Sequence, residues 1–143
     1  MAEYAAAFHD GTMTSRIISL PIDSTDPQRL AGFWADVLGW RVRETGFQQT
    51  EHGPDGAVLT PPSGDGVELD FRWVPEPKTT KNRLHLDMTP EPHEDHAAEV
   101  ARIVALGARR VDVGQGEDAP WAVLADPEGN EFCVLPPKRS LLG

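Results

Sequence analysis

Two similar stretches decide the fold: Leu30-Ala-Gly-Phe-Trp-Ala-Asp-Val-Leu-Gly-Trp-Arg-Val42 and Ala98-Glu-Val-Ala-Arg-Ile-Val-Ala-Leu-Gly-Ala-Arg-Arg-Val111. Each predicts an amphipathic helix that ends at Leu-Gly and is followed at once by a β-prone segment. We also expect a strand before each helix and further strands after it. Two similar modules on one chain typically share a core and enclose a cleft, where small molecules bind.

The bulk composition indicates one globular domain. A chain of 143 residues is long enough for one domain and too short for two independent ones. Its net charge of −10 argues against nucleic acid and against an anionic membrane surface as partners. Cys133 is the single cysteine, so no internal disulfide forms, and we expect a cytoplasmic protein.

The chain divides at a Pro- and Lys-rich stretch. We expect a flexible N-terminal tail (1–14), one domain (15–137) and a C-terminal tail (138–143). Within the domain, module one covers 15–75, a linker covers 76–81 and module two covers 82–137.

The first module begins with a predicted strand over 16–23, where apolar and polar residues alternate. Asp26 and Pro27 are typical of a helix start, and Gly39 is typical of a helix end. The stripe that should pack on a sheet consists of Leu30, Phe33, Trp34, Val37 and Leu38. Further expected elements are strands at 40–44, 57–60 and 67–73, with a loop or ragged hairpin at 45–56.

The second module repeats this order. We expect a strand at 84–88, a helix from about His93 to Leu106, and strands at 109–113, 121–125 and 131–135. The order strand–helix–strand–strand–strand therefore occurs twice. Antiparallel strands with helices on one face indicate an α+β fold.

Strand alternation separates polar from apolar faces. Asp70 and Arg72 share one face of their strand, and His85 and Asp87 share one face of theirs. These polar faces either line the cleft or face water, as one side of an antiparallel sheet often does.

Several motifs resemble those of glyoxalase-like proteins. They are the repeat, Asp26-Pro, Phe33-Trp34, Leu38-Gly39, Asn82-Arg-Leu-His-Leu-Asp87, Leu106-Gly-Ala and Asp126-Pro-Glu-Gly-Asn-Glu-Phe-Cys-Val-Leu135. Such proteins belong to the vicinal oxygen chelate superfamily, with glyoxalase I, bleomycin-resistance proteins and extradiol dioxygenases. The resemblance covers residues 15–137. It implies two tandem βαβββ modules that form a curled, mostly antiparallel sheet around a cleft, with the helices on the outer face.

The resemblance also implies positions for a metal. Metal enzymes of the superfamily hold a divalent ion with side chains from the first and last strands of each module. Those positions here are Ser19, Arg72 or Asp70, His85 and Cys133. Serine is a poor ligand and arginine repels a cation, so we expect no metal cofactor. Any ion would be held by His85, Asp70, Glu131 and Cys133.

The same positions supply candidate site residues. His85 is the candidate catalytic acid–base group, or else a histidine satisfied by its neighbours. Arg72 is expected to hold an anionic substrate group, or else to pair with Asp70 or Glu131. The other candidates for substrate binding are Asp70, Ser19, Cys133, Asp87 and Trp121.

These residues lead to three hypotheses for function. The first is a protein that binds a small organic molecule in the inter-module cleft, acting as a lyase or isomerase through His85. The second is a non-catalytic binding or sequestration protein of the bleomycin-resistance type. The third is a metal-dependent lyase or dioxygenase. The resemblance also implies a homodimer, and neither nucleic acid nor a membrane is expected as a partner.

Overall fold

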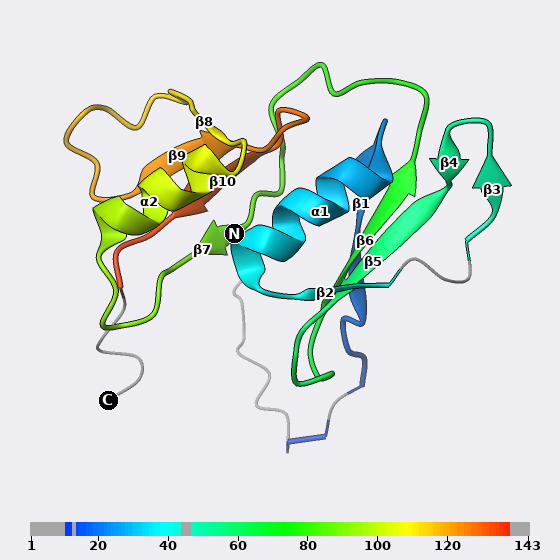
Figure 1. Ribbon diagram of the computed structural model, residues 1–143. Helices are drawn as coiled ribbons and strands as arrows, with labels where there is room; N and C mark the ends of the chain where they lie inside the picture. Colours follow the sequence, from blue (N-terminus) through cyan, green and yellow to red (C-terminus); the bar gives the residue numbers. More distant parts are fainter. Residues whose placement is uncertain (1–10, 13, 44–46, 138–143) are drawn as a thin grey trace, which may run out of the picture.

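The computed structural model describes residues 11–12, 14–43 and 47–137. Most of the two predicted tails, and part of the loop expected at 45–56, lie outside these residues. The elements follow one another in the order β1, α1, β2 to β7, α2 and β8 to β10 (Figure 1).

The first sheet has the strand order β1–β6–β5–β2. Its strands are β1 (Ser19–Ser24), β2 (Arg41–Arg43), β5 (Gly56–Thr60) and β6 (Glu68–Trp73). β1 and β6 run parallel, and the other neighbours are antiparallel. A separate hairpin, β3 (Gln49–Thr50) and β4 (Gly53–Pro54), forms within the segment expected to be a loop or ragged hairpin.

The second sheet repeats this topology with the strand order β7–β10–β9–β8. Its strands are β7 (Asp87–Met88), β8 (Arg109–Arg110), β9 (Ala122–Ala125) and β10 (Glu131–Val134). β7 and β10 are parallel, and the remaining pairs are antiparallel. The structure therefore confirms the α+β class with mostly antiparallel strands, arranged as two separate four-stranded sheets rather than a closed barrel.

Strand β7 is shorter than the strand predicted at 84–88. Its ladder to β10 begins only where Cys133 N–H donates to the Leu86 carbonyl, at 2.9 Å. Upstream, Asn82 N–H donates to the Glu131 carboxylate instead of to a strand, and Leu84 is 79% exposed. A side chain thus replaces the backbone ladder at this end of the sheet.

Helix α1 carries the caps that the sequence indicates, whereas α2 has a different start. Helix α1 (Pro27–Leu38) begins at Asp26, whose side chain accepts from Arg29 N–H, and ends at Gly39 with φ 69°. Helix α2 (His96–Ala105) begins three residues later than predicted, because the Asp95 side chain caps Ala98 N–H at 3.1 Å. The ring of His96 lies 2.9 Å from the Val134 carbonyl.

Helix α1 lies across the first sheet (Figure 1) and also contacts the second sheet through Trp34. The Trp34 ring packs edge-on against Phe132 of β10, with centroids 4.7 Å apart, and Phe33 packs against Trp34. Arg102 of α2 donates to the carbonyls of Asp36 and Val37 at the end of α1. One core therefore joins both sheets, built mainly from Leu30, Phe33, Trp34, Leu59, Phe71, Val100, Ile103, Leu124 and Phe132.

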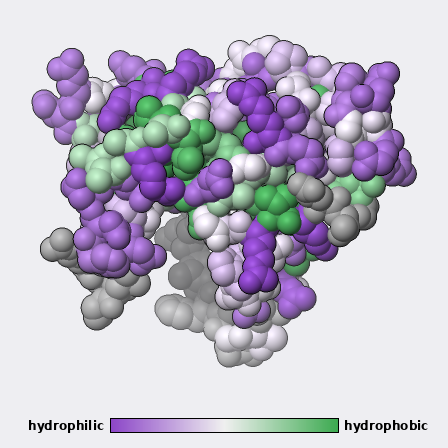
Figure 2. Space-filling model, viewed as in Figure 1, coloured by the Kyte–Doolittle hydropathy of each residue, from purple (hydrophilic) through white to green (hydrophobic). Residues whose placement is uncertain are grey.

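The visible surface is mostly polar and charged, as the composition indicates (Figure 2). Apolar side chains reach this face between α1 and α2. In the part of the chain that the structure describes, neither helix has the length and apolar character needed to cross a membrane.

Candidate functional site

A cavity of about 700 Å³ lies between the two sheets. Its walls come from β1, from the connecting segment (residues 74–86) and from the turn and strand around β10. Apolar side chains form much of the lining: Leu20, Ile22, Trp34, Leu86 and Phe132. Polar groups at the cavity include His85, Asn82 and Glu131.

Glu131 fixes the connecting segment against β10. Its carboxylate lies 3.0 Å from Lys78 Nζ and accepts from Asn82 N–H at 2.9 Å. Burial acts to raise the pKa of Glu131, but the hydrogen bond from Asn82 and the Lys78 ammonium outweigh it and hold the pKa below its ordinary value. The carboxylate therefore stays ionised and holds one wall of the cavity in place.

Two carboxylates in the turn between β9 and β10, those of Asp126 and Glu128, contact the first module. Asp126 is buried and accepts from the Trp34 indole N–H at 3.1 Å and from Asn130. Burial raises its pKa above the ordinary value, although these hydrogen bonds act in the opposite direction. Glu128 accepts from Ser24 Oγ and, at 2.7 Å, from Thr25 N–H. These contacts set the relative position of the two sheets.

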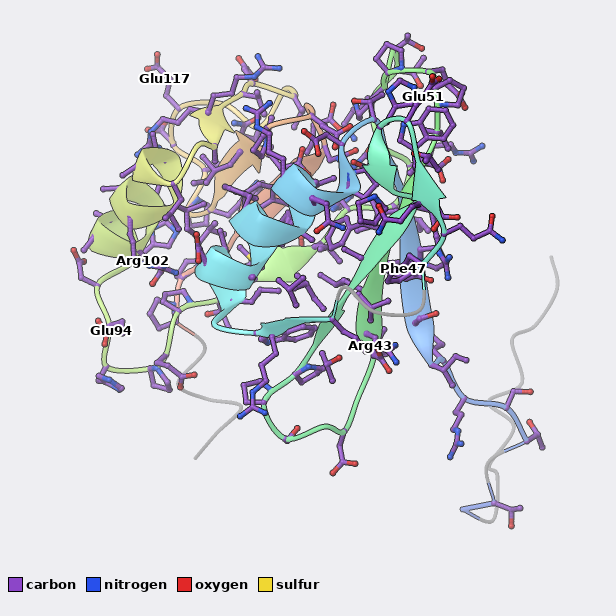
Figure 3. The ribbon with its side chains drawn as sticks, turned by 45° about the vertical axis from the view of Figure 1, so that its right-hand side comes forward. Arg43, Phe47, Glu51, Glu94, Arg102 and Glu117 are labelled. Carbon is purple, nitrogen blue, oxygen red and sulfur yellow. The ribbon has the colours of Figure 1, made fainter. Side chains whose placement is uncertain are left out.

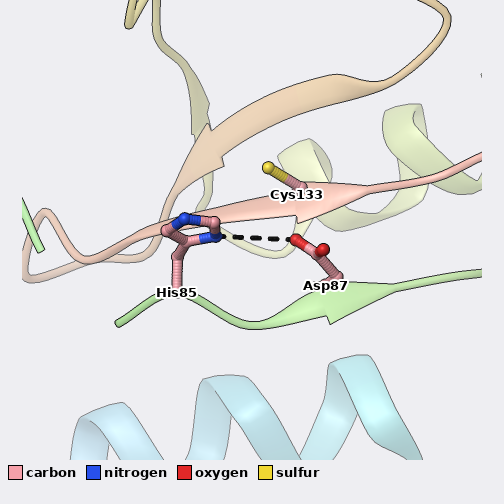
Figure 4. A group of neighbouring side chains, drawn as sticks. All are labelled: His85, Asp87 and Cys133. Atoms are coloured by element: carbon pink, nitrogen blue, oxygen red, sulfur yellow. Dashed lines mark ion pairs between the residues drawn. The ribbon is translucent and has the colours of Figure 1, made fainter. Parts of the chain in front are cut away.

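His85, Asp87 and Cys133 project to the same side of β7 and β10 (Figure 4). One ligand atom from each lies within 4.8 Å of the other two, and His85 Nδ1 is 3.6 Å from Asp87 Oδ1. The pairing of Cys133 with Asp87 in the parallel ladder brings the thiol beside the carboxylate. Burial, reinforced by the Asp87 charge, raises the pKa of Cys133.

Arg72 and Asp70 pair with each other on the first sheet, with Arg72 Nε 2.9 Å from Asp70 Oδ1. The Phe47 ring lies over this guanidinium, 5.2 Å from its central carbon, beside β5 and β6 (Figure 3). Neither Asp70 nor Arg72 lines the inter-sheet cavity. The ion pair, which was one of the two alternatives for Arg72, is therefore present in the structure.

The other predicted residues are dispersed. Ser19 begins β1 and pairs in register with Glu68, away from the cavity lining. Trp121 precedes β9 and is 38% exposed. Of all the candidate residues, only His85 and Glu131 line the cavity between the sheets.

The four residues named as ligands for any ion, His85, Asp70, Glu131 and Cys133, do not form one cluster in the structure. Asp70 lies on the first sheet beside Arg72, and Glu131 is engaged by Lys78 and Asn82. His85 and Cys133 do lie together, and Asp87 is their neighbour in place of the two expected carboxylates. The donor atoms present are one imidazole nitrogen, one carboxylate oxygen and one sulfur, which suits a borderline ion.

Sequence reasoning missed residues of the connecting segment that form the cavity. Lys78 was expected in the linker and Asn82 at the start of module two, and nothing in this Pro-rich stretch indicates a buried partner for either. Lys78 and the Asn82 backbone amide contact Glu131, which is 49 or more residues away in the chain. Contacts over such separations leave no periodic pattern in the sequence. Phe47 belongs to the segment expected to be a loop or ragged hairpin, and the structure places its ring over Arg72.

Comparison with protein families identifies the chain. Residues 19–135 match the model of the glyoxalase-like domain, so this protein belongs to the glyoxalase-like family of the vicinal oxygen chelate superfamily. A comparison with curated proteins finds no match.

Solved structures share the fold at low sequence identity. TnmS3, an antibiotic-binding protein from Streptomyces sp. CB03234, is 20% identical with a TM-score of 0.57, over 89% of this chain and 100% of that one. A glyoxalase/bleomycin resistance protein/dioxygenase family enzyme from Burkholderia phytofirmans is 20% identical, with a TM-score of 0.59, over 82% of this chain and 95% of that one. The fosfomycin resistance protein FosX from Listeria monocytogenes is 12% identical, with a TM-score of 0.63, over 90% of this chain and 97% of that one.

Proposed function

We propose that this protein binds a small, largely apolar organic molecule in the cavity between its two sheets. The observation that carries the proposal is the cavity itself, whose volume of about 700 Å³ lies in the range typical of ligand sites. Trp34 and Phe132 are its aromatic lining residues, and Leu20, Ile22 and Leu86 are aliphatic ones. Apolar ligand surface is stabilised there by removal from water.

The polar groups of the cavity are held in place before any ligand arrives. Glu131 is held by Lys78 and Asn82, and Asp126 is held by Trp34 and Asn130. A preorganised wall costs less ordering entropy on binding than a mobile one. This supports tight, stoichiometric binding, as in a sequestration protein. The antibiotic-binding TnmS3 shows that the same fold accommodates small molecules.

A lyase or isomerase is the second candidate, and the pair of His85 and Asp87 favours it. His85 lines the cavity, and the Asp87 carboxylate lies close enough to orient the imidazole. Arg72 is paired with Asp70 and does not line this cavity, so it is not placed to hold an anionic group there. Replacing His85 with Ala would abolish turnover while leaving binding intact if the catalytic candidate is right.

The binding proposal is tested with N-phenyl-1-naphthylamine, a neutral apolar dye that fluoresces when it leaves water. We expect saturable binding of one dye per chain. Leu20→Trp fills the cavity and should weaken binding at least about tenfold, which corresponds to a loss of about 1.4 kcal/mol. Leu106→Trp adds the same bulk at the end of α2, outside the cavity, and should leave binding unchanged.

Two results would overturn this proposal. One is the absence of saturable dye binding by the folded protein. The other is equal binding by wild type and Leu20→Trp, with circular dichroism confirming that both are folded. Turnover, as distinct from binding, would be sought by mass spectrometry of the molecule recovered after incubation with the protein.

We also propose that the protein is a homodimer and acts in the cytoplasm. β1 and β7 are edge strands of the two sheets, with no further strand beside them among the described residues. Just before these edges, Ile17, Ile18 and Leu84 are 75%, 67% and 79% exposed. A second copy would cover these side chains and the unpaired strand edges, both of which are unfavourable in water.

A further inference from the structure

The connecting segment (residues 74–86) passes from the first sheet to the second and forms one side of the cavity (Figure 1). It begins beside β1, where Val74 N–H donates to the Ser24 carbonyl at 2.9 Å. It reaches β10 where Asn82 N–H donates to the Glu131 carboxylate at 2.9 Å. These two attachments define a first-sheet end and a second-sheet end of the cavity.

Positive charge is concentrated at the second-sheet end. Three of the chain's 13 lysines and arginines, Lys78, Lys81 and Arg83, lie within residues 78–83, where there is no Asp or Glu. All three line the cavity. Lys78 is neutralised by Glu131 at 3.0 Å, whereas Lys81 and Arg83 are exposed and have no ion-pair partner among the residues that the structure describes. Two positive charges are therefore free to act on a bound molecule.

Negative charge at the cavity lies mainly at the first-sheet end. Asp23 belongs to β1, and Glu128 accepts from Thr25 N–H just beyond that strand, at 2.7 Å. Glu76 lies close to the start of the connecting segment, near Val74. Asp23 and Glu76 come from separate elements, and Glu128 already accepts hydrogen bonds from the protein. The cavity is therefore polarised along the connecting segment, with its free cations together at one end.

The charge of Lys81 acts on side chains of the second sheet. Burial and the Asp87 carboxylate raise the pKa of Cys133, whereas the Lys81 ammonium acts to lower it. Asp87 lies 3.6 Å from His85 Nδ1 but does not line the cavity. Lys81, Arg83 and His85 do line it, so the polar groups at this end include two cations and a hydrogen-bonding imidazole.

We propose that the cavity selects amphipathic organic anions, whose apolar body contacts Trp34 and Phe132 and whose anionic group is held by Lys81 and Arg83. A carboxylate, sulfonate or phosphonate fits this role, because a guanidinium and an ammonium both donate to such oxygens. The inference rests on the proposed binding function and adds the chemical class of the ligand. It replaces the sequence expectation that Arg72 holds the anionic group.

The test compares two dyes that share the same rings. 8-Anilino-1-naphthalenesulfonate is N-phenyl-1-naphthylamine with one added sulfonate, and both fluoresce when they leave water. We expect one dye per chain and tighter binding of the sulfonate dye, in spite of the net charge of −10. Added salt should weaken binding of the sulfonate dye much more than binding of the neutral one, because salt screens exposed charges.

The double variant Lys81→Gln/Arg83→Gln removes both charges and keeps polar side chains. It should lower the ratio of the two affinities, sulfonate dye over neutral dye, at least about fivefold, as expected for two partly exposed charge pairs. The ratio cancels any general change in the cavity. Arg29→Gln/Arg110→Gln is the matched control, because it removes two exposed cations that do not line the cavity. Its ratio should equal that of wild type.

The possible failures give different results, with circular dichroism confirming that each variant is folded. If wild type binds the neutral dye as tightly as the sulfonate dye, the anion inference is wrong and the cavity proposal stands. If the control lowers the ratio as much as Lys81→Gln/Arg83→Gln, the preference comes from overall charge and not from this pair. Leu20→Trp should weaken both dyes, and undiminished binding of the sulfonate dye would place it outside the cavity. If neither dye binds wild type, both proposals are wrong.

Discussion

The indole N–H of Trp34 donates to the buried carboxylate of Asp126, at 3.1 Å, and so joins helix α1 to the turn between β9 and β10. The two residues are 92 positions apart in the chain. The bond links the two halves of the protein between two buried side chains. Its neighbours, Glu128 with Ser24 and Thr25, reinforce the same junction from the surface side.

Trp34→Phe should destabilise the protein by about 1–3 kcal/mol, because it removes the indole donor and leaves Asn130 as the remaining donor to Asp126 Oδ2. The measurement is urea unfolding followed by far-ultraviolet circular dichroism. Trp121→Phe is the control, since Trp121 is 38% exposed and should change stability far less. Equal stability of Trp34→Phe and wild type would show that this bond does not hold the two halves together.

Glu131→Gln should lower stability at pH 7 by about 1–3 kcal/mol, because Glu131 makes charge-assisted contacts with Lys78 and Asn82. The pKa of Glu131 is lower in the folded protein than the ordinary value of 4.5. Its contribution is therefore fully present above about pH 4.5 and is lost as the pH falls through the folded-state value. Wild type and Glu131→Gln should converge in stability on acidification, as measured by denaturant unfolding at several pH values.

The control for this series is Glu68→Gln, whose partner Arg43 is largely exposed. That change should cost only about 0–1 kcal/mol at pH 7. Limited trypsin digestion gives an independent readout, because loss of the Glu131 contacts should speed cleavage after Lys81 and Arg83. A stability difference that stays constant from pH 7 down to pH 3 would contradict the assignment.

Gly56→Ala should be destabilising by about 1–3 kcal/mol, because the new methyl group would lie 2.8 Å from the Phe47 ring. It would also lie 3.0 Å from the Phe71 carbonyl. A double-mutant cycle with Phe47→Ala separates the two contacts. The cost of Gly56→Ala should shrink in the Phe47→Ala background if the ring is the main obstacle. An unchanged cost would place the strain at the Phe71 carbonyl instead.

Ile18→Glu and Leu84→Glu should convert the proposed dimer to monomer. Each substitution puts a charged side chain in place of an apolar one that a second copy would bury beside an edge strand. Sedimentation velocity at several protein concentrations measures the effect. Val113→Glu is the matched control, since Val113 is exposed but lies in the loop after β8. A wild-type protein that is monomeric at all concentrations would remove the dimer from the proposed function.

Local sequence features determined the elements of the fold. The spacing of apolar residues predicted which face of α1 is buried. Asp26, Pro27 and Gly39 predicted where this helix begins and ends, because caps act through neighbouring backbone groups. The repeated order of elements indicated the family. For His85, Asp87 and Cys133, alternation placed the first two on one face, but only strand pairing brought Cys133 beside them.

The tertiary structure decided which long-range partners meet. Arg72 pairs with Asp70, Glu131 holds Lys78 and Asn82, and the cavity opens beside the connecting segment rather than beneath Arg72. The sequence by itself set helices, strands and their polar faces, since these depend on residues a few positions apart. The meeting of groups many tens of residues apart depends on how two sheets pack around α1, which no local pattern encodes.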